Sequence, residues 1–389
     1  MTKPGLIESV TVSRLERSIS AGTLTLVTPS GRERTFTAAK PGPTAHLVVH
    51  DWRVLEAVLA RGDIGLGEAY MKGWWDSPDL EAFIAFSIAN VDSLGRLAWG
   101  SPLHRLASIV TNRLLRRNSL SGSRRNIMAH YDLGNAFYAL WLDKSMSYSS
   151  AIFDNADDEL EGAQSRKYNR ILERIGDRDR VLEIGCGWGG FIAEAERQKR
   201  HVTALTISSE QYSFVRERSG ANVDVKLQDY RQSSGRYPAI VSIEMLEAVG
   251  ERYWPRYFRT LRERMTDDGI AVVQTISIRD DMFQSYRACS DYIRHFIFPG
   301  GMLPSVSRLA GEAEKAGLQI REVYSFGKDY AKTLRAWLER FEAAKEPIHS
   351  LGYDEGFMRG WRLYLAMCAA AFEVGRTNVH QIELVPAPR

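Results

Sequence analysis

The sequence predicts an α/β protein in which a doubly wound parallel sheet is preceded by a smaller α+β domain. Two observations predict this arrangement. From about residue 159 onward, strand-like and helix-like segments alternate, which is typical of parallel strands joined by right-handed crossovers. Before residue 93, short apolar stretches separated by turn formers are followed by helical patterning. The 389 residues suffice for two or three domains, and no internal repeat is found.

The amino-terminal domain is predicted over residues 1–92. Short apolar stretches between about residues 24 and 47 are interrupted by turn formers at 28–31 and 40–43, which indicates strands. A stretch rich in glycine and aromatic residues follows at 65–75. Between these segments an amphipathic helix is predicted from the apolar stripe formed by Trp52, Leu55, Val58 and Leu59.

Residues 93–125 are predicted to form a basic amphipathic linker. No acidic residue occurs between Ser93 and Tyr131, whereas seven arginines do. Apolar residues recur between them at helical spacing, which is typical of a helix on an anionic membrane surface. Each basic side chain near such a surface adds only ~1 kcal/mol, so a solvated linker helix stays an equal alternative. A nucleic-acid-binding arm is a third interpretation, weakened by the scarcity of aromatic residues.

Composition and charge indicate an ordinary soluble protein. Hydrophobic residues make up 44% and charged residues 25% of the chain, and the net charge of +3 gives no argument for nucleic acid. Three cysteines are too few for a disulfide framework and suit a reducing cytosol. No apolar run approaches the ~18 residues of a spanning helix, and the first ten residues lack the apolar core of a signal peptide. We therefore expect a cytoplasmic protein.

The carboxy-terminal domain, predicted over residues 126–389, contains a glycine loop between a strand and a helix. Its glycines, among them Gly185, Gly187 and Gly189, satisfy G-x-G-x-x-G, which alone would indicate a dinucleotide. Glu183 would repel a pyrophosphate but attract an ammonium or sulfonium group, and S-adenosylmethionine carries both. The alternative is that the glycines serve only close packing of strand and helix. The buried strands are predicted at Val181 to Ile184, Val202 to Ile207, Ile240 to Ile243 and Ala271 to Ile276.

Polar residues after the second and third strands complete a predicted S-adenosylmethionine site. Thr206, Ile207 and Gln211 would lie near the ribose, and Gln228 and Asp229 near the adenine. Asp229 would accept a hydrogen bond from the adenine amino group. The carboxyl ends of these strands meet at one edge of the sheet. We therefore expect a Rossmann-like class I S-adenosylmethionine-dependent methyltransferase. No Asn/Asp-Pro-Pro-aromatic motif and no Pro-Cys pair occurs, which counts against a nucleic-acid substrate.

The chain resembles the cyclopropane-fatty-acyl-phospholipid synthases and related fatty-acid methyltransferases. The resemblance covers about Asn126 to the carboxyl terminus, and more loosely residues 65–80. It is carried by the glycine loop with Trp188 and by segments 130–135, 146–151, 206–211, 244–250, 297–305, 326–330 and 364–372. The resemblance implies methyl transfer to the cis double bond of a phospholipid acyl chain, after which a base removes a proton and the ring closes. Such a reaction needs a dry tunnel and aromatic faces that stabilise positive charge.

The resemblance implies bound bicarbonate as the base. The side chains of Glu247 and Tyr330 and the backbone at Ser150 and Ile276 would hold it. Glu247 would accept the hydroxyl of bicarbonate while Tyr330 donates to one of its oxygens. Two adjacent anions are costly unless a cation is near, and the sulfonium and the carbocation supply one. The alternative for Glu247 is an acid on a helix surface.

Three positions depart from the pattern common in the family. Gln274 and Ala248 replace histidines, and Ser150 replaces a cysteine. Gln274 can still donate through its amide, but it cannot titrate. This form is similar to a subgroup that includes ring-forming enzymes and enzymes that give methylene- or methyl-branched chains, so the sequence leaves the product open.

Cys368 has two interpretations, a core thiol on an apolar helix face or a reactive thiol beside the substrate. Cys186 is expected to line the cofactor pocket without taking part in chemistry. We assign Tyr148 and Ser149 to the methionine carboxylate. His130 and Tyr131 either pack beneath the cofactor or touch it.

The expected partners are unsaturated phospholipid acyl chains and an anionic membrane surface, with peripheral association to the inner membrane. No nucleic acid or metal is expected, and a homodimer is compatible with the sequence. A methyltransferase for a soluble small molecule, with Glu247 as general base, is a competing hypothesis. A non-catalytic lipid-binding or scaffold protein is a third.

Overall fold

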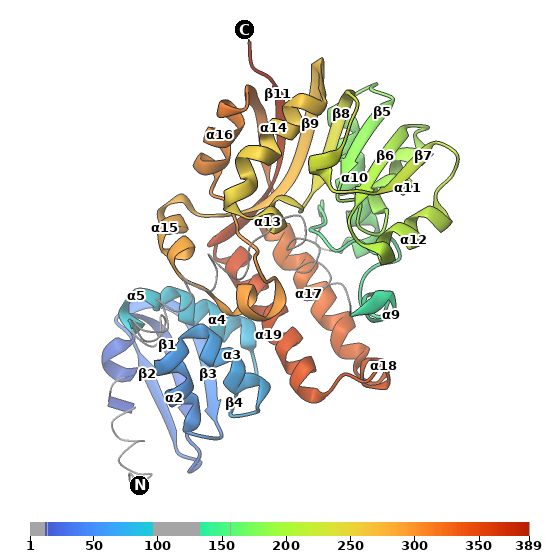
Figure 1. Cartoon of the computed structure of the whole chain (residues 1–389). Coiled ribbons are helices and arrows are strands. Elements are labelled where there is room, and N and C mark those ends of the chain that lie inside the picture. The colour runs from blue at the N-terminus through green and yellow to red at the C-terminus, as the bar shows by residue number, and fades with distance from the viewer. Residues whose placement is uncertain (1–11, 14, 96–132, 156, 389) are drawn as a thin grey trace.

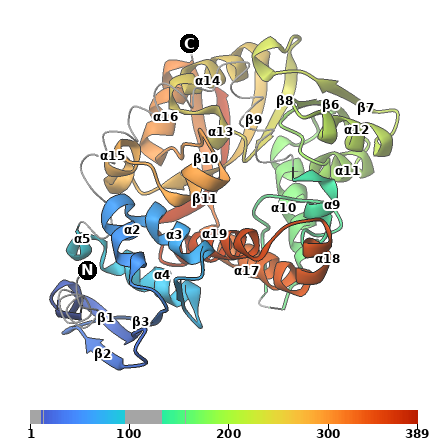
Figure 2. The same cartoon turned by 60° about the horizontal axis from the view of Figure 1, so that its bottom comes forward.

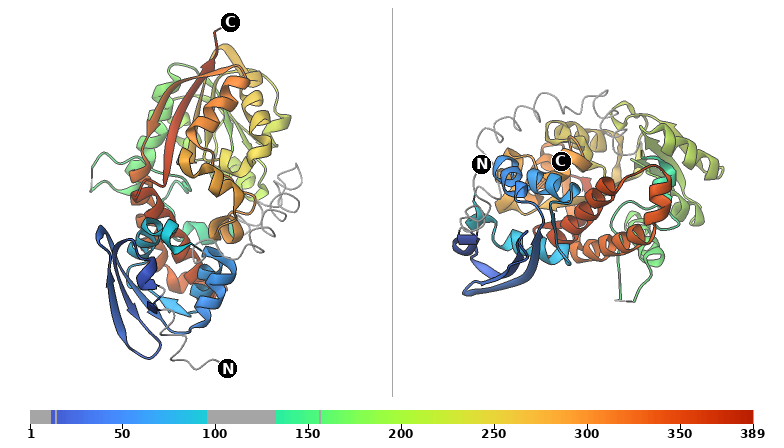
Figure 3. Two further views of the ribbon diagram at one scale, coloured as in Figure 1. Left: turned by 90° about the vertical axis from the view of Figure 1, so that its left-hand side faces the viewer. Right: turned by 90° about the horizontal axis from the view of Figure 1, so that it is seen from below.

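The computed structural model describes residues 12–13, 15–95, 133–155 and 157–388, and these residues form two sheets. The two sheets lie at opposite ends of the molecule (Figure 3, left). Between them lie the long helices α17 (Gly327–Ala343) and α19 (Glu355–Glu373) (Figure 1). Most of the predicted basic linker, together with His130 and Tyr131, falls outside the described residues. No helix within the described ranges is long and apolar enough to cross a bilayer.

The amino-terminal sheet has the strand texture that the sequence predicts. β1 is antiparallel to β2 and parallel to β3, and the strand order is β2-β1-β3-β4. The turn predicted at residues 40–43 is instead the start of β3. Gly22 and Gly42 explain this difference, because a Cβ on Gly42 would lie 2.8 Å from the Gly22 nitrogen, so only glycine lets the strands approach there. The strands are β1 (Ala21–Val27), β2 (Glu33–Thr37), β3 (Lys40–Val49) and β4 (Trp75–Asp76).

The helices of this domain join its sheet to the rest of the molecule. The predicted stripe lies on α2, where Val58 is buried but Leu59 is 37% exposed. The glycine-rich stretch forms much of α3, where a Cβ on Gly67 would lie 2.1 Å from the ring of Tyr292. α3 and α4 pack against α19 (Figure 2). The helices are α2 (Arg53–Arg61), α3 (Asp63–Met71), α4 (Leu80–Ala89) and α5 (Val91–Leu94).

The large sheet confirms the Rossmann-like prediction with one difference. Its order is β10-β11-β9-β8-β5-β6-β7, and β11 runs antiparallel to both neighbours. The pair α17 and α19 causes this reversal. The chain leaves the carboxyl edge after β10 and returns there, where Thr377 pairs with Ile278 at the end of β9. The strands are β5 (Arg180–Ile184), β6 (His201–Thr206), β7 (Val223–Leu227), β8 (Tyr237–Ile243), β9 (Met265–Ile278), β10 (Leu318–Ser325) and β11 (Thr377–Pro386).

Helices cover both faces of the large sheet, as buried parallel strands require. Successive residues of β5 point to opposite faces: Val181 packs with one group of helices and Leu182 with the other. The first group comprises α10 (Leu160–Ile175), α11 (Gly190–Arg197) and α12 (Ser209–Arg218). The second comprises α14 (Trp254–Arg264) and α16 (Val306–Lys315).

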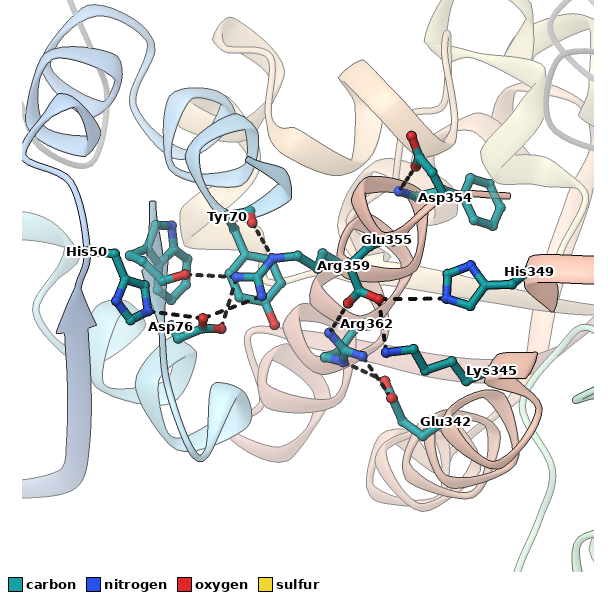
Figure 4. A network of polar contacts seen from close by, with 12 residues as sticks. His50, Tyr70, Asp76, Glu342, Lys345, His349, Asp354, Glu355, Arg359 and Arg362 are labelled. Carbon is teal, nitrogen blue, oxygen red and sulfur yellow. Dashed lines mark hydrogen bonds and ion pairs between the residues drawn. The ribbon is translucent and has the colours of Figure 1, made fainter. Parts of the chain in front are cut away.

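Arg359 of α19 links the amino-terminal domain to the helices α17 and α19 through hydrogen bonds (Figure 4). Its guanidinium donates to the carbonyl oxygen of Trp75 and to Asp76 Oδ1, both at 2.9 Å, and to the carbonyl oxygen of Tyr70 at 2.5 Å. It also lies 4.0 Å from the centre of the Tyr70 ring. On the other side of α19, Glu355 accepts Lys345 Nζ at 3.0 Å, next to the short helix α18 (Lys345–Ser350).

Candidate active site

A continuous cavity of about 590 Å³ extends from the interior of the amino-terminal domain to the carboxyl edge of the large sheet. One end is apolar, with walls from β1, β3 and α4. The other end is bounded by the loops after β5, β6 and β7. The apolar walls include Leu24, Leu26, Leu47, Val49, Phe83 and Phe86. The cavity therefore connects a lobe suited to hydrocarbon with the edge where ligands of such sheets bind.

Glu183 is the charged group of the glycine loop, and it lines the cavity. Its side chain is buried, and no described residue donates a hydrogen bond to Oε2. Burial raises the pKa of its carboxyl group to about 8, although Lys167 nearby lowers it. A buried carboxylate with one oxygen that receives no hydrogen bond from a described residue fits a ligand that brings positive charge.

The glycines of the loop have different roles. Gly187 has a φ of +51° and open space where a Cβ would lie, so a ligand can approach its backbone. Gly185 also lines the cavity, but a Cβ there would lie 2.9 Å from Met245. Gly189 is not part of the cavity wall; with a φ of +86° it makes the turn into α11. Cys186 was expected to line the pocket, but it packs into the core beneath α10 and α11 instead.

The predicted ribose and adenine contacts also reach the cavity. Thr206 Oγ1 donates to Gln211 Oε1 at 2.8 Å, which fixes the glutamine side chain. Asp229 accepts Arg231 Nε at 2.8 Å and Nη2 at 2.7 Å, so its charge is balanced within the chain. The lining residues in this group are Thr206, Ile207, Gln211, Gln228 and Asp229.

Tyr148 and Ser149 line the cavity beside a buried lysine that the sequence analysis missed. Lys167 of α10 is fully buried and donates to Ser149 Oγ at 2.7 Å and to Gln164 Oε1 at 2.6 Å. Because Ser149 Oγ accepts this bond, its own hydrogen is free to be donated. Burial lowers the pKa of Lys167 to about 7, although Glu244 counteracts this. The sequence signal that could have identified Lys167 is its position on the buried stripe of α10.

Glu244 gathers three donors that the sequence analysis assigned to another ligand. Its Oε1 accepts the Ser150 backbone nitrogen at 2.8 Å and Gln274 Nε2 at 2.9 Å. Its Oε2 accepts the Tyr330 hydroxyl at 2.6 Å. Burial raises the pKa of this carboxyl group. The sequence analysis assigned Glu244 no role beyond its place in the segment 244–250; the signal that could have identified it is a second acid at the carboxyl end of β8.

Glu247 lies on the one-turn helix α13 (Leu246–Val249). It accepts a hydrogen bond from the last of the donors expected to hold bicarbonate, the Ile276 backbone nitrogen. Its Oε1 accepts the Ile276 backbone nitrogen at 2.5 Å and Thr275 Oγ1 at 2.9 Å. Its Oε2 is buried and receives no hydrogen bond from a described residue. Burial, reinforced by the nearby Glu244, raises the pKa of Glu247 to about 8.

The residues present do not fit bicarbonate as predicted. The backbone nitrogens of Ser150 and Ile276 and the Tyr330 hydroxyl all donate to carboxylates of the chain itself. Gln274 donates to one of the same carboxylates. Bicarbonate thus stays a prediction that the geometry does not support.

Aromatic side chains surround the cavity near these carboxylates. The rings of Tyr330 and Phe372 stack with their centres 4.4 Å apart, and the ring centres of Phe298 and Tyr148 are 6.3 Å apart. The Tyr148 and Tyr364 hydroxyl oxygens are 3.0 Å apart. Phe298 and Tyr330 both line the cavity. Their π faces can stabilise a cation formed in a dry site.

Cys368 also lines the cavity, on α19. Burial raises the pKa of its thiol, so the thiolate needed for nucleophilic attack is disfavoured. The geometry supports a packing role for Cys368. Within the described residues, no cluster of three or more His, Cys, Asp and Glu side chains is arranged to hold a metal ion.

Comparison with known proteins agrees with this geometry. The chain is 36% identical to "Tuberculostearic acid methyltransferase UfaA1" of Mycobacterium tuberculosis, covering 90% of this chain and 86% of that protein. It is 35% identical to the "Cyclopropane-fatty-acyl-phospholipid synthase" of Escherichia coli, covering 84% of each.

Solved structures give the same result over about two thirds of the chain. The cyclopropane synthase MmaA2 from Mycobacterium tuberculosis has a TM-score of 0.63 at 28% identity, covering 67% of this chain and 97% of that one. CmaA1, a mycolic acid cyclopropane synthase complexed with SAH and CTAB, has a TM-score of 0.62 at 29% identity with the same coverage. The family model described as "Mycolic acid cyclopropane synthetase" matches residues 118–382. The chain therefore belongs to the mycolic acid cyclopropane synthetase family, whose members are S-adenosylmethionine-dependent methyltransferases of lipid acyl chains.

Proposed function

We propose that this enzyme transfers a methyl group from S-adenosylmethionine to the cis double bond of an unsaturated acyl chain in a membrane phospholipid, forming a cyclopropane fatty acid. The cavity carries this proposal, because it joins an apolar lobe in the amino-terminal domain to the glycine loop. A methyltransferase for a soluble small molecule would not need such a lobe. The relative from Escherichia coli, named for this activity, supports the same conclusion.

The residues around the glycine loop fit S-adenosylmethionine. Glu183 Oε2 would accept a hydrogen bond from the ammonium group, and Gly187 allows close approach of the ligand, with Gly185 beside it in the cavity wall. Tyr148 and Ser149 would donate to the methionine carboxylate. When bound, the cofactor supplies the methyl group as an electrophilic sulfonium. The ribose and adenine contacts would come from Thr206, Ile207, Gln211, Gln228 and Asp229.

The substrate end of the cavity has two tasks, to exclude water and to stabilise charge. The apolar walls surround the acyl chain, which keeps the short-lived carbocation from being captured by water. Tyr330 and Phe298 present aromatic faces in the same region.

We propose that the predicted domain division also describes how lipid is handled. Residues 1–92 would form an accessory lipid-binding domain, 93–125 a basic linker at the anionic membrane surface, and 126–389 the catalytic domain. The apolar lobe between β1, β3 and α4 supports the first assignment. The enzyme would then act as a cytoplasmic protein peripherally bound to the inner membrane.

A second candidate product is a methylene-branched acyl chain, from which a methyl branch follows by reduction. It is favoured by the relative named tuberculostearic acid methyltransferase, which is 36% identical over 90% of this chain. Both products begin with the same methyl transfer and end with loss of one proton. They differ in the fate of the released electron pair, which either closes a ring or, after a hydride has moved from the methylated carbon to the cationic carbon, forms a double bond.

Expression in a host rich in cis-unsaturated phospholipid is expected to increase the mass of its fatty acids by one CH₂ group. Mass spectrometry of the fatty acid methyl esters measures this gain. A proton spectrum separates the products, because the methylene protons of a cyclopropane ring resonate at high field and those of a methylene branch resonate in the olefinic region. Unchanged fatty acids in cells that contain folded, cofactor-binding enzyme would contradict the proposal.

Cofactor affinity is expected to increase with pH up to about pH 8. In the free enzyme the pKa of Glu183 is about 8, so below that pH the carboxyl is largely protonated. A cationic ligand favours the carboxylate, so binding releases a proton and the affinity gains up to about tenfold per pH unit. Calorimetry with S-adenosylmethionine across this range measures the slope. Glu183→Gln should bind more weakly and lose the slope; a variant that retains it would assign the proton to another group, such as Lys167.

A further inference from the structure

The site contains two buried carboxylates, whereas the family resemblance implies one carboxylate and a bound bicarbonate ion. Glu244 and Glu247 are three residues apart in sequence, at the carboxyl end of β8, and both line the cavity. Between them they accept hydrogen bonds from Ser150, Gln274, Thr275, Ile276 and Tyr330. These donors include every hydrogen-bond donor expected to hold bicarbonate, and the remaining expected group, Glu247, is one of the two acceptors.

We propose that the Glu244 side chain takes the place of bicarbonate in this enzyme, so that the Glu244–Glu247 pair receives the proton and turnover needs no dissolved anion. This inference rests on the proposed function. Its distinguishing observation is that the Ser150 nitrogen, Gln274 Nε2 and the Tyr330 hydroxyl converge on one carboxylate at 2.6–2.9 Å.

The backbone at Glu244 supports a specific role for its side chain. Its φ is +47°, a conformation that favours glycine and that other residues adopt at a cost. This chain has a glutamate here although glycine would relieve the strain. The carboxylate is also fixed from three elements, since its donors come from the loop before α10, from β9 and from α17.

The atoms balance without an added base. The π electrons of the olefin attack the methyl carbon, the carbon–sulfur bond breaks, and a carbocation results. A carbon–hydrogen bond of the new methyl group then breaks, and its electron pair bonds to the cationic carbon to close the ring. For the methylene product, a hydride first moves from the methylated carbon to the cationic carbon, and the electron pair of the broken carbon–hydrogen bond then forms the double bond to the methylated carbon. The proton goes to Glu247 Oε2, the oxygen that accepts no hydrogen bond from a described residue. Glu244 beside it increases the proton affinity of Glu247, because two adjacent carboxylates do not both ionise readily.

The test is turnover on vesicles of an unsaturated phospholipid in buffer depleted of carbon dioxide, with and without added bicarbonate. The wild-type enzyme should turn over equally in both conditions. Saturable stimulation of the wild-type enzyme by bicarbonate would overturn the inference. In contrast, the absence of any lipid methylation would contradict the proposed function itself, so the two failures are distinguishable.

Two variants of Glu244 provide the second part of the test. Glu244→Gly suits the backbone and frees the donors; turnover should fall at least about 10²-fold without bicarbonate and recover in part when bicarbonate is added. Carbon-13-labelled bicarbonate should show a bound signal with Glu244→Gly and none with the wild-type enzyme. Glu244→Gln keeps the shape of the glutamate side chain and still fills the space that bicarbonate would need. It should therefore lose turnover, and added bicarbonate should not restore it. Undiminished turnover of Glu244→Gly in depleted buffer would overturn the inference.

The matched control is Glu263→Gln on the exposed surface of α14, where the glutamate side chain is 38% exposed. It should behave as the wild-type enzyme in every arm of the experiment. Calorimetry with S-adenosylmethionine shows that each variant is folded, because the cofactor contacts lie on other elements.

Discussion

Glu247→Gln is expected to lower turnover by about 10²–10⁴-fold, the usual contribution of a positioned acid or base, while cofactor affinity changes by no more than a few-fold. The amide can keep one oxygen toward the Ile276 nitrogen and the Thr275 hydroxyl. It then places an NH₂ group where the unpaired Oε2 lies, and this group cannot take a proton. Lipid turnover and calorimetry with S-adenosylmethionine measure the two effects separately.

Glu251→Gln is the control for this substitution. Glu251 follows α13 closely but accepts Arg287 Nε at 2.6 Å on the outside of the protein. Its substitution should leave turnover near the wild-type value. Undiminished activity of Glu247→Gln would remove Glu247 from the chemistry.

Arg359→Ala is expected to destabilise the protein by about 2–3 kcal/mol and to reduce methylation of phospholipid vesicles strongly. The substitution leaves the carbonyl oxygens of Tyr70 and Trp75 and the carboxylate of Asp76 without their donor at the domain contact. The amino-terminal domain carries the apolar lobe, so weaker docking separates that lobe from the glycine loop. Cofactor affinity should change little, because no cofactor contact comes from this domain.

Chemical denaturation gives the loss of stability, and vesicle assays with calorimetry give the two functional effects. Arg340→Ala is the control: Arg340 pairs with Glu161 within the catalytic domain, and both side chains are about one third exposed. Its loss should cost no more than about 1 kcal/mol. If Arg359→Ala methylated vesicles at the wild-type rate, the lobe would not be the route of the acyl chain.

The sequence predicts best those features that are local. β5, β6, β8 and β9 are buried apolar runs, and the glycine loop is a contiguous motif, so each can be recognised without knowledge of the rest of the fold. The cofactor residues follow from the rule that such sheets bind ligands at their carboxyl edge. Gly189 and Cys186 are the exceptions within the loop, because backbone direction decides which side faces the cavity.

The role of Glu244 could not be predicted in this way. Its donors are 94, 30 and 86 residues away in sequence, and the residues next to Glu244 do not predict them. Lys167 is similar, since a lysine within a helix ordinarily faces solvent and only tertiary packing buries this one. The direction of β11 depends on the route of two intervening helices. Each of these features arises from contacts between distant segments.

The insertion of α17 and α19 between β10 and β11 has a consequence for the order of folding. Ile278 and Thr377, which pair at the edge of the sheet, are separated by about a hundred residues, and closing so long a loop is slow. Because β11 follows both helices in the chain, the sheet can be completed only after both helical segments have been synthesised. A chain interrupted at this stage would hold a nearly finished nucleotide fold but no enclosed passage for hydrocarbon, so assembly of the lipid route comes late.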